Sequence, residues 1–213
     1  MRNAFFAFAL FSASAFAADQ AARPGVAIAI VYDTSGSMGD PVASSKNAQE
    51  PKYKVAGEAL KAIIEKIDTF AKTTPVEATL ITFQGPQVRL ARWEKAPFEK
   101  WLAAFSDPRA NTPLGEAIAS AGKALEGSSL AKKHIVVLTD GESNGELKPE
   151  LALRKLKGKP GAPQVYIIAF DVKSQAFDAV KKEGALVLPA TGKTLEAGLT
   201  TLFSKKILLE DEE

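Results

Sequence analysis

Short apolar runs alternate along the chain with longer stretches whose apolar positions recur at the helical period. The predicted strands are 26–32, 76–83, 87–93, 134–139, 164–170 and 185–189. The runs at 26–32, 134–139 and 164–170 are nearly continuous, as expected of strands that are buried on both faces of a parallel sheet. The run at 87–93 alternates and follows a turn, so we expect an edge strand that forms a hairpin with 76–83.

Helical periodicity is clearest in two segments. Leu60, Ile63, Ile64, Ile67 and Phe70 share one face of the first, and Leu114, Ile118, Ala121 and Leu125 share one face of the second. Further helices are predicted at 96–105, 149–157, 174–183 and 194–203. This order predicts an α/β fold with a doubly wound, Rossmann-like, mostly parallel β-sheet, one antiparallel edge strand, and helices on both faces.

The first 17 residues are typical of a signal peptide. Arg2 precedes an apolar run that ends in the small-x-small sequence Ala15-Phe16-Ala17, so we expect cleavage after Ala17. The run from Ala4 to Ala17 is shorter than the roughly 20 residues that a membrane-spanning helix needs. The expected organisation is a signal peptide at 1–17, a short lead at 18–25, one domain at 26–205 and an acidic C-terminal tail at 206–213.

Composition and charge indicate where the protein acts and which partners it lacks. The chain has no cysteine, so an exported form cannot use disulfides, which suits a periplasmic or secreted bacterial protein. Its 27 basic and 25 acidic residues nearly balance, which offers no overall attraction to nucleic acid or anionic membranes. No transmembrane segment is expected after signal cleavage, and a monomer is the default expectation.

Oxygen-bearing side chains follow two of the predicted strands and precede one helix. Asp33, Ser35 and Ser37 come directly after 26–32, Asp140 follows 134–139, and Thr112 precedes the helix that begins near Pro113. Each position taken alone has an ordinary explanation as a turn residue or a helix cap. In a doubly wound sheet, however, a ligand crevice lies beyond the carboxyl ends of the strands, so the five side chains are predicted to converge there.

The predicted ligands are all hard oxygens. His134 is the only histidine and lies at the opposite end of its strand from Asp140. Carboxylates and hydroxyls suit Mg²⁺, with Mn²⁺ and Ca²⁺ as further candidates, and they disfavour zinc. An octahedral Mg²⁺ site usually keeps positions for water or an outside ligand, which could be an anionic oxygen.

These residues carry a family resemblance. Asp33-Thr34-Ser35-Gly36-Ser37, Thr112 and Asp140-Gly141 resemble the metal-ion-dependent adhesion site (MIDAS) of von Willebrand factor A (VWA) domains. The resemblance extends from about Val26 to Phe203. It implies that the serines coordinate the ion directly, that Thr112 and the aspartates bind directly or through water, and that an Asp or Glu of a partner protein completes the coordination.

The resulting functional hypothesis is a metal-dependent adhesion or assembly module that performs no catalysis. The rim that would contact the partner is predicted to include Met38, Asp40, Pro41, Asn111, Glu142, Ser143 and Asn144, along with the loop 43–52 and the segment 106–111. Lys52, Lys54, Lys61 and Lys66 are predicted to lie on the outer side of a helix without a role.

Two alternatives remain open at this point. A metal-assisted hydrolase would use the ion to activate water and would need a general base beside it. A structural subunit of an envelope complex would retain the site only as a vestige or for stability. Residue 35 is Ser where a D-x-D phosphotransferase needs an acid, and neither Ser35 nor Ser37 has the glycines of a G-x-S-x-G elbow.

Overall fold

A six-stranded sheet forms the centre of the molecule in a computed structural model that describes residues 22–85, 87–141 and 143–209. Its strands are β1 (Arg23–Tyr32), β4 (Val76–Thr82), β5 (Val88–Arg92), β6 (Leu130–Thr139), β7 (Gln164–Phe170) and β8 (Leu186–Ala190), in the spatial order β5-β4-β1-β6-β7-β8. The predicted signal peptide at 1–17 lies outside the described residues, as do 18–21, Glu142 and the last four residues of the acidic tail.

Strand register aligns the ends of the two central strands. β1 pairs in parallel with both β4 and β6, and Tyr32 lies opposite Thr82 on one side and Leu138 on the other. The residues after Tyr32 and Leu138 therefore leave the sheet side by side at its carboxyl edge. β5 is antiparallel to β4, which confirms the predicted edge hairpin.

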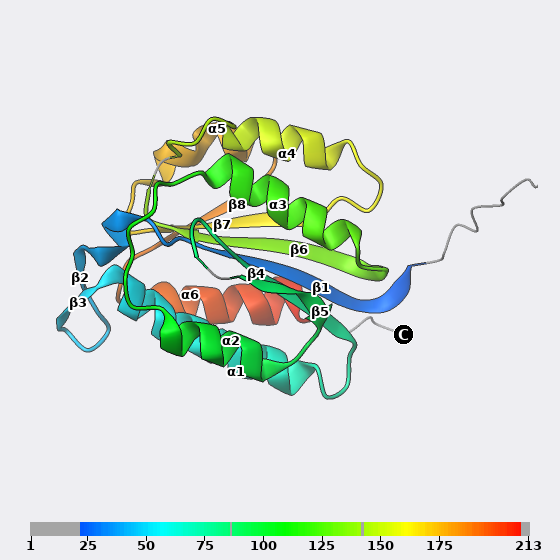
Figure 1. The fold of residues 1–213 in the computed structure, drawn as a ribbon, viewed down its shortest axis with the longest axis horizontal. Coiled ribbons are helices and arrows are strands. Elements are labelled where there is room, and N and C mark those ends of the chain that lie inside the picture. Colours follow the sequence, from blue (N-terminus) through cyan, green and yellow to red (C-terminus); the bar gives the residue numbers. More distant parts are fainter. Residues whose placement is uncertain (1–21, 86, 142, 210–213) are drawn as a thin grey trace, which may run out of the picture.

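Helices cover both faces of the sheet. α1 (Lys52–Phe70), α2 (Lys95–Ala104) and α6 (Leu195–Leu202) lie on one side, and α3 (Leu114–Glu126), α4 (Pro149–Lys157) and α5 (Asp178–Lys182) lie on the other (Figure 1). This arrangement confirms the predicted mostly parallel, Rossmann-like α/β fold with one antiparallel edge strand.

The apolar stripes of the helices explain these positions. On α1, Ile63, Ile64 and Ile67 are at most 1% exposed, and on α3 Ile118 is fully buried, as the sequence periodicity predicted. Burying each such side chain contributes about 1.5–3 kcal/mol before conformational entropy is subtracted, so the helices are fixed on the sheet mainly by packing. Within the described residues, no helix has both the length and the hydrophobicity needed to cross a bilayer.

The structure differs from the prediction in two connections. The predicted loop between β1 and α1 contains a 3₁₀ turn, η1 (Gly36–Gly39), and a small hairpin, β2 (Pro41–Ala43) with β3 (Gln49–Pro51). Strands of three residues are too short to show a hydrophobic period, so the sequence did not reveal them.

The predicted helix at 174–183 is divided in two. A 3₁₀ turn, η2 (Ser174–Phe177), precedes α5, because Phe177 leaves helical geometry with φ −107° and ψ 16° and its side chain is buried. At the end of the chain, α6 continues as a π-helical turn, η3 (Phe203–Ile207).

Candidate metal-binding site

Three loops meet at the carboxyl edge of the sheet, and they bring together the predicted oxygen ligands. Ser35 Oγ and Ser37 Oγ lie 3.1 Å apart, and Ser37 Oγ donates a 2.8 Å hydrogen bond to Asp140 Oδ1. The side chains after β1 therefore contact the carboxylate after β6, although 103 residues separate Ser37 from Asp140.

Thr112 reaches the same cluster from the loop before α3. A Cβ atom added to Gly141 would lie 3.8 Å from Thr112 Oγ1 and 4.0 Å from Ser37 Oγ, so these two hydroxyls flank the same small residue. Thr112 is 6% exposed. All five predicted ligands are thus brought to one place, and their binding of a metal remains a prediction.

Asp33 is the most buried member of the cluster, with no solvent exposure. Its Oδ1 accepts a 2.7 Å bond from the Ser35 amide, and its Oδ2 accepts a 2.5 Å bond from Thr139 Oγ1. Burial raises the pKa of Asp33, while the hydrogen bonds from Ser35 and Thr139 act in the opposite direction. Thr139 was missed by the sequence analysis, although it stands at the end of an apolar run directly before Asp140.

Backbone hydrogen bonds fix the first loop against the segment before Thr112. The Gly36 amide donates to Ala110 O at 3.1 Å, and the Arg109 amide donates to Thr34 O at 3.0 Å. Ser35 and Ala110 also form an isolated parallel bridge. Because the main chain on both sides is paired, the two loops hold a defined separation.

The third loop is tied to the second through Asn144. Its side-chain Oδ1 accepts a 2.7 Å bond from the Thr112 amide, and its own amide donates to Thr112 O at 3.0 Å. Ser143 Oγ also donates to Thr112 O, at 3.3 Å. Asn144 therefore positions Thr112, a role that the sequence analysis did not assign to it.

The prediction that Lys52 is an outward-facing lysine without a role is wrong. Lys52 is the first residue of α1, its side chain is 10% exposed, and its Nζ donates a 2.8 Å hydrogen bond to Asp140 Oδ2. The helical period could have indicated that Lys52 is buried, because Lys52 shares the inner stripe of α1 with Ala56 and Leu60, both of which are buried.

The predicted rim is partly corrected. Met38 is fully buried and packs in the core beneath η1, so it cannot contact a partner. Asp40, Pro41, Asn111 and Asn144 are exposed, and Ser143 is half-buried. Glu142 lies outside the described residues.

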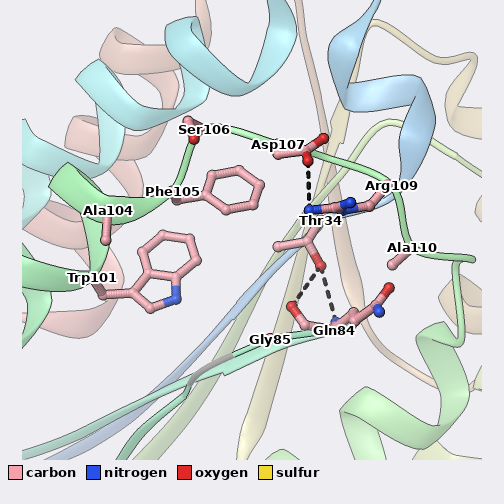
Figure 2. Close-up of a pocket in the computed structure, with 10 residues that line it drawn as sticks. All are labelled: Thr34, Gln84, Gly85, Trp101, Ala104, Phe105, Ser106, Asp107, Arg109 and Ala110. Carbon is pink, nitrogen blue, oxygen red and sulfur yellow. Dashed lines mark hydrogen bonds and ion pairs between the residues drawn. The ribbon is translucent and has the colours of Figure 1, made fainter.

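A pocket of about 440 Å³ opens beside the first loop. Figure 2 shows its lining residues: Thr34, Gln84, Gly85, Trp101, Ala104, Phe105, Ser106, Asp107, Arg109 and Ala110. Trp101 and Phe105 stack with ring centroids 5.1 Å apart and form one wall, and Arg109 with its ion-pair partner Asp107 lies at the other side.

The chemistry of the cluster fits a hard cation. Within the described residues, no three His, Cys, Asp or Glu side chains gather closely enough to hold a metal ion. A metal at this edge of the sheet would be held by Asp33, Asp140 and the three hydroxyls of Ser35, Ser37 and Thr112. Carboxylate and hydroxyl oxygens are compatible with Mg²⁺ or Mn²⁺ and disfavour zinc.

Comparison with known families gives one match. The profile of the von Willebrand factor type A domain matches residues 28–142, more than half of the chain, and the matched segment contains all five predicted ligands. Comparison with curated proteins gave no match to this sequence.

Solved structures with the same fold include domains of bacterial pilus proteins. The vWF domain of the type V pili tip protein Mfa5 from Porphyromonas gingivalis superposes with a TM-score of 0.69 at 13% identity, covering 89% of this chain and 98% of that one. The pilus adhesin SpaC from Lactobacillus rhamnosus GG gives 0.68 at 15% identity over 85% of this chain. The PilB minor pilin from Streptococcus sanguinis gives 0.61 at 14% identity, again over 85%. The alignments span 30% of SpaC and 60% of PilB, and identities this low establish the fold alone.

Proposed function

Because this chain belongs to the von Willebrand factor type A family, we propose that it is an exported, non-enzymatic adhesion or assembly module with a metal-dependent binding site. A divalent cation, Mg²⁺ in the first instance, would be held by Asp33, Ser35, Ser37, Thr112 and Asp140. An Asp or Glu side chain of a partner protein would complete its coordination.

The observation that carries this proposal is the contact between Ser37 and Asp140. Their 2.8 Å hydrogen bond joins two loops that leave different strands, and Ser35 Oγ lies 3.1 Å from Ser37 Oγ. These hydroxyls and carboxylates already point toward one another, so a cation would replace hydrogen bonds with coordination and would need no rearrangement of the sheet. When bound, the cation would supply an electrophilic centre that attracts a carboxylate oxygen.

The surface around the cluster would determine which acidic side chain is accepted. The pocket beside Thr34 combines an aromatic wall with the exposed Arg109 guanidinium, which suits a side chain that neighbours the partner's acid (Figure 2). Asp40, Pro41 and Asn111 supply an exposed polar rim on other sides. Aromatic and arginine side chains are enriched where protein interfaces gain most of their affinity.

The position of His134 favours a binding role over hydrolysis. It is the only histidine of the chain, and it lies in the middle of β6, six residues before Asp140; the expectation that it begins its strand is wrong, because β6 starts four residues earlier, at Leu130. It is 6% exposed and buried against Tyr166, so it cannot take a proton from water at the cluster.

Export rests on the predicted signal peptide, and the adhesin and pilin domains with the same fold agree with it. Cleavage after Ala17 would release the folded domain into the periplasm or the medium. The mass of the mature protein, measured from a cell that carries out bacterial export, would test this directly.

Coupling between cation and carboxylate is the property that tests the proposal. Thermal unfolding of the chelator-stripped protein is recorded with Mg²⁺, with the N-acetylated and C-amidated tripeptide Gly-Asp-Gly, and with both. Gly-Asn-Gly with the same blocked ends serves as the matched control, because it has no carboxylate. We expect Mg²⁺ to raise Tm and Gly-Asp-Gly to raise it further only when Mg²⁺ is present. An equal effect of both peptides, or a peptide effect that survives chelation, would contradict a carboxylate completing the metal site.

A further inference from the structure

A buried ammonium group lies against one of the proposed metal ligands. Lys52 Nζ donates to Asp140 Oδ2 at 2.8 Å, while the other oxygen of that carboxylate, Oδ1, accepts from Ser37 Oγ at 2.8 Å. The Lys52 side chain is 10% exposed and that of Asp140 is not exposed. Because solvent screens this ion pair weakly, the ammonium acts strongly on the charge of the cluster.

The backbone holds Lys52 in this place at an electrostatic cost. The Lys52 amide donates to Asp40 O at 2.9 Å, directly after the hairpin of β2 and β3. A cation in the first turn of a helix is disfavoured by the helix dipole, and an isolated buried ammonium is costly. A lysine at this position therefore depends on the carboxylates that face it.

A second carboxylate faces the same ammonium from the end of β7. Asp171 Oδ2 lies 3.8 Å from Lys52 Nζ, and its side chain is 42% exposed. Asp171 adopts a left-handed backbone conformation with φ 53°, and its amide donates to Ala190 O at 2.7 Å. Lys52 thus lies between a carboxylate inside the proposed metal site and one outside it.

We propose that Lys52 is a tethered counter-ion that keeps the affinity of the site for a bare divalent cation low. It occupies one oxygen of Asp140 and neutralises one of the two negative charges in the ligand set. The arriving cation therefore meets a ligand set with about half its charge, and an additional carboxylate from a partner restores the balance. Strong cation binding would then depend on the partner. This inference rests on the proposed metal site and specifies how it is regulated.

The test compares Lys52→Met with Lys54→Met by titration calorimetry of Mg²⁺ into chelator-stripped protein. Both changes remove one positive charge from the first turn of α1, but Lys54 is exposed to solvent. We expect Lys52→Met to bind Mg²⁺ at least about tenfold more tightly than wild type, because the repulsion between ammonium and cation is removed. Lys54→Met should bind as wild type does.

Stability without metal gives a second readout. Lys52→Met leaves Asp140 buried without its ion pair, so its Tm in chelator should fall while the increase in Tm produced by Mg²⁺ should grow. A purely structural ion pair would lower Tm by similar amounts with and without Mg²⁺. Lys52→Arg keeps the charge and should retain wild-type Mg²⁺ affinity.

Asp171→Asn keeps the test decisive if Lys52→Met fails to fold. Asp171→Asn removes the outer carboxylate, so the Lys52 ammonium would interact with Asp140 alone. It would then neutralise Asp140 more completely, and Mg²⁺ binding should weaken. Unchanged or weaker binding by a folded Lys52→Met, or tighter binding by Asp171→Asn, would overturn the counter-ion role alone. Absence of Mg²⁺ binding by both wild type and Lys52→Met would overturn the metal site and the counter-ion role together.

Discussion

Thr139 donates a 2.5 Å hydrogen bond from its hydroxyl to Asp33 Oδ2, across the boundary between the two central strands. The parallel register that places Tyr32 opposite Leu138 makes Asp33 and Thr139 the next neighbours at the sheet edge. Both residues have no solvent exposure. The sheet itself therefore orients the first carboxylate of the proposed metal site.

Replacing Thr139 with Val should destabilise the metal-free protein by about 1.5–3 kcal/mol, the usual contribution of a hydrogen bond to a charged group. Valine has the same shape but lacks the hydroxyl, so the loss falls on the bond to Asp33 and on the longer 3.3 Å bond that the hydroxyl accepts from the Gly141 amide. Urea unfolding in chelator measures the change. Thr139→Ser keeps the hydroxyl, and equal stability of the two variants would show that the bond contributes nothing.

Asn144 should affect metal binding without being a ligand. Asn144→Ala removes the 2.7 Å bond from the Thr112 amide to Oδ1, so the loop that carries the Thr112 hydroxyl loses an anchor. We expect a stability loss of about 0.5–1.5 kcal/mol and a several-fold weaker Mg²⁺ affinity by calorimetry. Asn111→Ala, the same change at an exposed position one residue before Thr112, is the control and should leave Mg²⁺ affinity unchanged.

Gly115 allows α3 to approach the loop that follows Asp140. A Cβ atom there would lie 1.9 Å from Leu147 O, and no rotamer can relieve a clash with main chain. Gly115→Ala should therefore lower stability by about 1–3 kcal/mol. Gly198, in α6, has open space around it, so Gly198→Ala should raise stability by about 0.5–1 kcal/mol. Urea unfolding measures both free energies of unfolding, and a change in the same direction for the two variants would contradict this account.

His134 should make the fold sensitive to acid. Burial, with the Lys132 ammonium adding to it, lowers the pKa of His134 to about 4. The unfolded chain binds the proton near the ordinary value of about 6.5, so protonation favours unfolding as the pH falls between these values. The contribution of His134 is complete above about pH 6.5 and is lost by about pH 4, a change of about 3 kcal/mol.

The difference between wild type and His134→Phe isolates this effect. Phe keeps a ring against Tyr166 but does not titrate. Denaturant unfolding from pH 7.5 to 4 should show a steeper loss of stability in wild type than in His134→Phe. Parallel profiles would mean that the buried imidazole does not control the acid sensitivity.

Much of the architecture was readable from hydrophobic periodicity. Ile63, Ile64 and Ile67 recur at the helical period and are buried against the sheet, and the apolar run 164–170 became β7 with the predicted bounds. The carboxyl edge of the sheet followed from strand direction, which is why Asp33 and Asp140 could be expected to meet.

The errors concern side chains whose environment depends on tertiary contacts. Met38 stands among polar loop residues but is buried, because the 3₁₀ turn η1 directs it into the core. Lys52 is charged and was therefore predicted to face solvent, although it lies on the inner stripe of α1. No local sequence pattern indicates that Asn144 positions Thr112, since the two residues are 32 positions apart in the sequence.

Calorimetric titration of Mn²⁺ into the chelator-stripped protein tests the central claim most directly. The wild type should show saturable binding with one ion per chain. The double variant Ser35→Ala, Ser37→Ala, shown to be folded by circular dichroism, should show none, because two of the five ligands are gone. Unchanged binding by that variant, or no saturable binding by either well-folded wild type or Lys52→Met, would contradict the proposed metal site.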